Sequence, residues 1–133
     1  MNTNVTGEQR PTVLIVEDSD LQNRMYQAIF RQLDIRSVRA GTKREALALA
    51  RQTMPALIIM DINLPDGTGI EATREIRAIE GLDKVPIIAV TTRLSTNQES
   101  TLREAGFTEF RSKPIDVADF GDLVKRQLAG VAT

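Results

Sequence analysis

The residues of this sequence best suited to chemistry stand directly after short segments with the pattern of strands. They are Glu17 and Asp18, Asp61, Thr91 and Thr92, and Lys113. Carboxylates that lie close together repel one another, and their pKa values rise unless a cation holds them. Mg²⁺ does this with near-octahedral oxygen ligands and some retained waters. If the fold brings these positions together, they would form an acidic Mg²⁺ site.

The same side chains suit a tetrahedral, dianionic group carried by Asp61. The cation, the ammonium group of Lys113 and the hydroxyl of Thr91 would each bind one of its oxygens. The reaction would be attack of a carboxylate on phosphorus, with the cation neutralising charge during the transfer. An Asp at a strand end is also common as a turn former or helix cap, so the other positions decide its meaning.

Hydrophobic patterning predicts five strands that alternate with five helices. The strands are expected at about 13–16, 35–40, 57–60, 86–90 and 107–112, and the helices at about 21–33, 43–53, 69–80, 96–105 and 117–128. Short apolar runs bounded by turn residues are typical of strands buried on both faces, and short crossovers imply a parallel, doubly wound α/β sheet. The carboxyl ends of such strands share one edge, so the polar positions would meet there.

Helical periodicity indicates which face of each helix enters the core. The first helix would bury Leu21, Met25, Ala28, Ile29 and Leu33, and the last would bury Val117, Phe120, Leu123, Val124 and Leu128. Tyr26 and Phe30 form a second stripe on the first helix, at i and i+4. This stripe would be either part of the core or, if exposed, a docking surface for a helical partner.

The composition excludes several classes of chemistry. The 133 residues have a net charge of −1, with 41% hydrophobic and 26% charged residues, as in one ordinary globular domain without a nucleic-acid partner. Without cysteine there is no disulfide or thiolate chemistry, and without histidine the usual general base is absent. No segment reaches the roughly 18–20 apolar residues of a membrane span. Residues 1–10 lack a secretion signal, so we expect a cytoplasmic protein with a flexible N-terminal lead.

Four motifs follow one another along the chain. They are Val-Leu-Ile-Val-Glu17-Asp18, Ile-Ile-Met-Asp61-Ile-Asn-Leu-Pro65-Asp-Gly67, Pro-Ile-Ile-Ala-Val-Thr91 and Ser-Lys113-Pro114. Their order and spacing resemble the receiver domains of two-component signalling, the CheY-like family, over about residues 11–128. The resemblance implies a receiver domain at 11–129 with a flavodoxin/CheY-like, five-stranded parallel sheet in the strand order 2-1-3-4-5.

The resemblance also implies a role for each acidic position. Asp61 would be the phospho-acceptor. Mg²⁺ would be held by the side chains of Glu17, Asp18 and Asp61 and by the backbone carbonyl of Asn63. Asn63 itself is either a plain loop residue or one that tunes hydrolysis, because its side chain would face the attacking water.

By the same resemblance, Thr91 and Lys113 would bind the phosphoryl group, and a cis bond between Lys113 and Pro114 would present the lysine. Phe110 matches the switch position, which changes burial when Thr91 moves toward the phosphate. It could instead be a static aromatic of an edge strand.

Thr92 departs from the family pattern, because a small residue, most often Ala, usually follows the signalling Thr. Its side chain would narrow access to the acceptor, contact the phosphoryl group, or be a tolerated substitution without effect. Arg93 would pair with an acidic partner, reach over the site, or be a solvated arginine.

We therefore expect a phosphorylation-dependent switch or relay. A histidine kinase or histidine phosphotransfer protein would pass phosphate to Asp61, and a downstream protein target would respond. We expect no enzyme activity beyond gain and loss of this phosphoryl group, and no direct contact with nucleic acid or membrane. We expect a single-domain, stand-alone response regulator. The motifs resemble those of stand-alone regulators about as much as those of hybrid-kinase receivers, so a receiver fragment of a hybrid histidine kinase is an open alternative.

Two rival functions use similar folds. A phosphatase with an aspartyl nucleophile normally has a second Asp two residues later, where this sequence has Asn63. A flavin-binding module needs a phosphate loop after the first strand, where Glu17 and Asp18 would repel the phosphate. Each pattern argues against the corresponding rival function.

Overall fold

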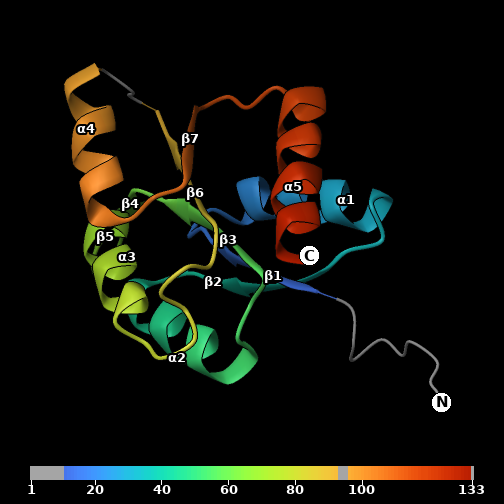
Figure 1. Cartoon of the computed structure of the whole chain (residues 1–133). Coiled ribbons are helices and arrows are strands. Elements are labelled where there is room, and N and C mark those ends of the chain that lie inside the picture. The colour runs from blue at the N-terminus through green and yellow to red at the C-terminus, as the bar shows by residue number, and fades with distance from the viewer. Residues whose placement is uncertain (1–10, 93–95, 133) are drawn as a thin grey trace, which may run out of the picture.

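The computed structural model describes residues 11–92 and 96–132 (Figure 1). Its elements, in chain order, are β1 (Thr12–Val16), α1 (Asp20–Gln32), β2 (Arg36–Ala40), α2 (Lys43–Thr53), β3 (Leu57–Asp61), β4 (Asn63–Leu64), β5 (Gly67–Thr68), α3 (Gly69–Arg77), β6 (Ile87–Thr91), α4 (Thr96–Ala105), β7 (Glu109–Ser112) and α5 (Val117–Ala132). The predicted lead at 1–10 lies outside the described residues.

Five strands form one parallel sheet in the order β2-β1-β3-β6-β7. Counting only these five, the order is 2-1-3-4-5, which confirms the predicted fold. A two-stranded antiparallel hairpin of β4 and β5 follows β3 and was not predicted. Within the part of the chain that the structure describes, no helix combines the length and hydropathy needed to cross a bilayer.

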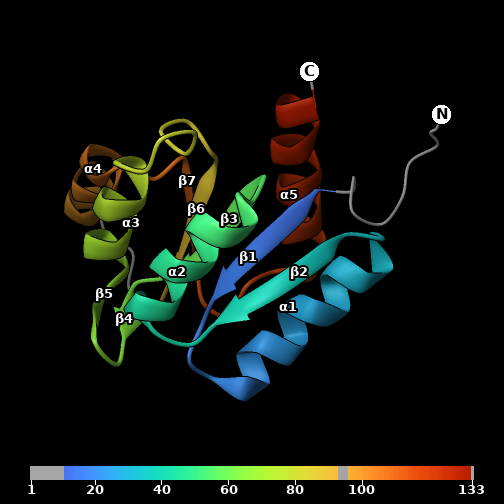
Figure 2. The same ribbon diagram turned by 90° about the horizontal axis from the view of Figure 1, so that it is seen from below.

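Helices cover both faces of the sheet (Figures 1 and 2). Successive residues of a strand point to opposite faces, so each buried strand supplies two cores. In β3, Leu57 and Ile59 pack with α1 and α5, while Ile58 and Met60 pack with α2, α3 and α4. The central strand, buried along its whole length, therefore joins the two layers.

The buried face of α1 differs from the prediction. Tyr26 and Phe30 are 1% and 0% exposed, and their rings lie 5.5 Å and 6.3 Å from the ring of Phe120 on α5. The docking surface predicted at Tyr26 and Phe30 is therefore wrong, and of the two interpretations the core is the correct one. Leu21, predicted to be buried, is 74% exposed, because it lies on the same solvent face as Ala28.

The first turn of α5 also departs from the predicted core. Val117 is 55% exposed, whereas Phe120, Leu123 and Val124 are buried as predicted. Val117 lines an open groove between α1 and α5. Gly121 lines the same groove, and because it has no side chain the space between the two helices is not filled there.

Local sequence signals fix where two helices begin. At α3, the Thr68 hydroxyl accepts from the Glu71 N–H (3.1 Å) and the Glu71 carboxylate accepts from the Thr68 N–H (2.9 Å), as a capping box predicts. At α2, Thr42 accepts from the Glu45 N–H, but the Glu45 carboxylate accepts from Gly41 instead. Only half of a capping box is formed at α2.

Candidate functional site

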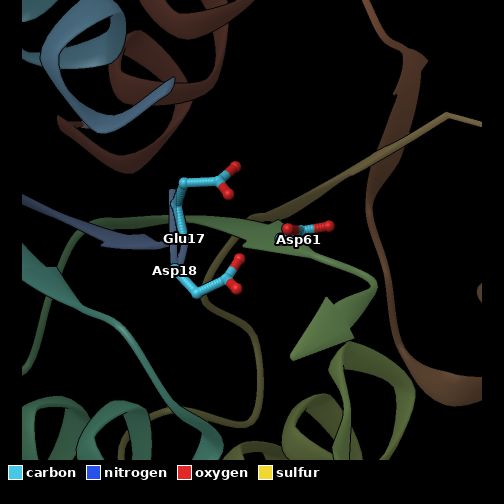
Figure 3. Close-up of side chains that lie close together, drawn as sticks. All are labelled: Glu17, Asp18 and Asp61. Carbon is cyan, nitrogen blue, oxygen red and sulfur yellow. The ribbon is translucent and has the colours of Figure 1, made fainter. Parts of the chain in front are cut away.

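Three carboxylates meet at the carboxyl edge of the sheet. Glu17 and Asp18 follow β1, and Asp61 ends the neighbouring strand β3 (Figure 3). Because Val16 is paired with Met60, the next residue on each strand carries its carboxylate to the same place. One oxygen from each of the three side chains lies within 4.8 Å of the other two.

A lysine from the far edge of the sheet reaches this cluster. The Lys113 ammonium lies 3.2 Å from a Glu17 oxygen and 3.4 Å from an Asp61 oxygen. Its backbone N–H donates to the Thr91 carbonyl (2.7 Å), and the bond to Pro114 is cis, as the resemblance implied. Lys113 is thus held where it contacts two carboxylates at once.

The pocket has more negative charge than its lysine neutralises. Glu17 and Asp61 are buried and Asp18 is exposed. Burial, and then the charge of Asp61, raise the pKa of Glu17, although the Ser19 N–H and Lys113 act in the opposite direction. Oxygen ligands in this number and spacing fit a hard divalent cation such as Mg²⁺.

The segment after β3 contacts both the side chain and the backbone of Asp61. The Asn63 N–H donates to an Asp61 carboxylate oxygen (3.2 Å), and the Asn63 side chain is exposed. Gly69, at the start of α3, packs on this segment: a Cβ there would collide with the Asp61 carbonyl and lie 2.8 Å from Met60 Cγ. Only glycine fits this contact.

The remaining predicted residues lie at different depths. Thr91 ends β6 and is buried, whereas its neighbour Thr92 is exposed. Phe110 is buried on β7, and the Arg103 guanidinium of α4 lies 4.7 Å from its ring centroid. Arg93 lies outside the described residues.

Two residues beside the site were not predicted. The carboxylate of Asp66, in the hairpin after β3, accepts from the backbone N–H groups of Lys43 and Arg44 and so links the hairpin to α2. Arg39, on β2, donates to the loop that carries Glu17 and Asp18. The Pro-Asp-Gly sequence indicated a turn at Asp66, but no sequence pattern indicated that Asp66 would contact α2.

The doubly wound parallel sheet, with an acidic pocket at its carboxyl edge, places the chain in the flavodoxin-like class of α/β proteins. Within that class, a family model of the response regulator receiver domain matches residues 13–125. The chain belongs to this family and is a receiver domain of a two-component system.

Individual relatives agree with the family. The polar-differentiation response regulator DivK of Brucella ovis is 36% identical over 117 residues, which are 88% of this chain and 95% of that protein. The receiver domain of the sensor histidine kinase PA1611 of Pseudomonas aeruginosa, a structure with a magnesium ion coordinated in its active site cleft, has a TM-score of 0.83 and 30% identity, covering 90% of this chain and 98% of that one. The chemotaxis protein CheY4 of Vibrio cholerae has a TM-score of 0.84 and 27% identity, covering 88% and 98%.

Proposed function

We propose that this receiver accepts a phosphoryl group on Asp61 from a phosphohistidine donor in the cytoplasm, in a reaction that requires Mg²⁺. The observation that carries the proposal is the pocket itself: Asp61 lies among Glu17, Asp18 and Lys113 at one edge of the sheet. The structure of the PA1611 receiver, with its magnesium ion in the active site cleft, supports the choice of ion.

The chemistry balances with the groups present. An oxygen of the Asp61 carboxylate attacks phosphorus, the phosphorus–nitrogen bond of the donor breaks, and the electron pair returns to the donor imidazole. Mg²⁺, held by Glu17, Asp18, Asp61 and the Asn63 carbonyl, would neutralise charge on the transferred group. Lys113 contacts Asp61 before transfer and would pair with the new phosphoryl charge afterwards.

The donor histidine comes from outside these residues, since the 133 residues contain none. A histidine kinase or a histidine phosphotransfer protein fits this role, and a downstream protein would read the phosphorylated form. Asn63 occupies the position where an aspartyl phosphatase has its second Asp, so we propose no turnover of other substrates.

Two exposed residues close in sequence to Asp61 and Thr91 would set how fast Asp61 is loaded and emptied. Asn63 follows the acceptor by two residues, and Thr92 follows the buried Thr91. In our proposal Thr91 shifts toward the phosphoryl group and Phe110 changes its burial in response.

A labelling experiment tests the proposal. The protein is incubated with Mg²⁺ and either acetyl phosphate or a phosphorylated histidine donor, and acid-labile label is counted beside Asp61→Asn. We expect label on the wild type alone, and none in excess EDTA. Equal labelling of both proteins, or none of the wild type with any donor, would overturn the assignment. Thr92→Ala, labelled in parallel, measures the effect of the Thr92 side chain on the loading rate.

A further inference from the structure

Arg39 binds the backbone of the segment that carries Glu17 and Asp18. From β2, its Nε donates to the Glu17 carbonyl (3.0 Å), and its Nη2 donates to the Asp18 carbonyl (2.9 Å). Its Nη1 is 2.6 Å from a carboxylate oxygen of Asp20, the first residue of α1. One guanidinium thus contacts Glu17 and Asp18, which follow β1, and Asp20, which begins α1.

These contacts fix the orientation of the peptide units of Glu17 and Asp18, two of the proposed cation ligands. The Glu17 N–H donates to the Ala40 carbonyl (2.9 Å), so β2 holds both the N–H and the carbonyl of Glu17. Both carbonyls accept from Arg39, and the side chains of the same two residues bring their carboxylates to Asp61. A planar guanidinium can satisfy several acceptors in fixed directions, which an ammonium cannot do.

The ion pair with Asp20 does not explain the arrangement. The Asp20 side chain is largely solvent-exposed, and exposed pairs contribute little to stability. An ion pair with Asp20 does not require the two hydrogen bonds to backbone carbonyls. These two bonds connect Arg39 to Glu17 and Asp18, which carry the carboxylates of the site.

We propose that Arg39 is a positioning residue for the cation site: it sets the geometry of the Glu17 and Asp18 carboxylates and thereby the affinity for Mg²⁺. The inference rests on the proposed function, since it requires that Mg²⁺ binds there. It makes an unusual prediction about sign. By charge alone, loss of an arginine would strengthen cation binding, whereas loss of positioning weakens it.

The experiment is a titration of ¹⁵N-labelled protein with MgCl₂, followed through the backbone amide shifts around residues 17–20. It compares the wild type, Arg39→Gln, Arg39→Lys and Asp20→Asn. Arg77→Gln is the matched control, because Arg77 also donates to backbone carbonyls, those of Leu82 and Gly106, in a different part of the molecule. Urea unfolding of each variant gives its stability separately.

Loss of an orienting partner of a metal ligand typically weakens binding by 10–100-fold. We expect both Arg39 variants to bind Mg²⁺ roughly tenfold more weakly, Asp20→Asn to bind nearly as the wild type does, and Arg77→Gln to lose stability without losing affinity. Should Arg39→Gln not fold, Arg39→Lys decides. Unchanged or tighter binding by the Arg39 variants overturns this inference alone. A wild type that binds no Mg²⁺ overturns the proposed function and the inference with it.

Discussion

Lys113 and Glu17 form an ion pair across most of the sheet. Their charged atoms lie 3.2 Å apart although 96 positions separate them in the chain. Glu17 follows β1 and Lys113 follows the edge strand β7, and two strands, β3 and β6, lie between these. The pair therefore forms only when all of these strands are in register, and Asp61 contacts the same lysine at 3.4 Å.

Replacement of Lys113 by Ala should lower the stability of the protein, and Mg²⁺ should reduce this effect. Glu17 and Asp61 would lose their shared cation, and we expect the free energy of unfolding to fall by about 1–3 kcal/mol in EDTA. Saturating Mg²⁺ should restore part of this loss, because the cation replaces the missing charge. Urea unfolding with and without Mg²⁺ measures both effects. A loss of the same size in both conditions would show that the lysine acts only through packing.

The raised pKa of Glu17 predicts a dependence of stability on pH. Burial and the charge of Asp61 raise this pKa in the folded state, so the folded protein binds the Glu17 proton more tightly than the unfolded chain does. The free energy of unfolding therefore falls as pH rises from the ordinary value of 4.5 through the raised one. Glu17→Gln removes this titration.

In EDTA, Glu17→Gln should be more stable than the wild type at pH 7.5 by a few degrees in melting temperature. The advantage should shrink as pH falls toward 4.5, because protonation removes the buried charge of Glu17 from the wild type. Thermal melts of both proteins across this range measure the difference. A difference that does not vary with pH would argue against the raised pKa.

The close contact between Gly69 and Asp61 predicts an intolerant position. Gly69→Ala places a methyl group against the Asp61 carbonyl, and overpacking of this kind costs about 1–3 kcal/mol or more. Gly121→Ala is the matched control: apart from the neighbouring residues and backbone of α5 itself, no atom of the described chain lies within 4 Å of its Cβ position, so it should stabilise the helix by up to ~1 kcal/mol. Urea unfolding of the two variants should give opposite signs.

The buried aromatic residues of α1 are expected to affect stability. Phe30→Ala should cost about 3–5 kcal/mol, because the ring is fully buried beside Phe120. Tyr26→Phe should be neutral or stabilising, because the buried Tyr26 hydroxyl has no hydrogen-bond partner among the described residues. Leu21→Ala, on the solvent face, should change stability by less than about 0.5 kcal/mol. A Tyr26→Phe variant that is clearly less stable would reveal a bound water.

The sequence predicted the sheet well because its strands are apolar runs that end abruptly in polar residues. The same feature predicted where Asp61 would lie, since strand ends of a parallel sheet share an edge. The buried face of α1 was misjudged because an apolar stripe of Leu21 and Ala28 resembles a core stripe in pattern. Which stripe is buried depends on packing against Phe120, 90 or more positions away, and no local pattern contains that contact.

The role of Arg39 could not be predicted for a related reason. A charged residue at the end of β2 is ordinary, and its bonds to the Glu17 and Asp18 carbonyls follow from the register of β2 against β1. The β4–β5 hairpin is too short for a periodic signal. The Arg39 hydrogen bonds and the β4–β5 pairing each join two segments of the chain, and a local sequence pattern describes only one segment at a time.

The complete burial of β3 has a consequence for motion. Its backbone amides, at the centre of the sheet between two hydrophobic layers, should exchange with solvent deuterium mainly when the whole domain unfolds. Asp61 is the last residue of one of the slowest-exchanging segments, whereas Asp18, Asn63 and Thr92 are exposed to solvent. We therefore expect the acceptor to stay fixed in the molecular frame when it is modified, and any rearrangement to occur in the exposed segments around Asn63 and Thr92.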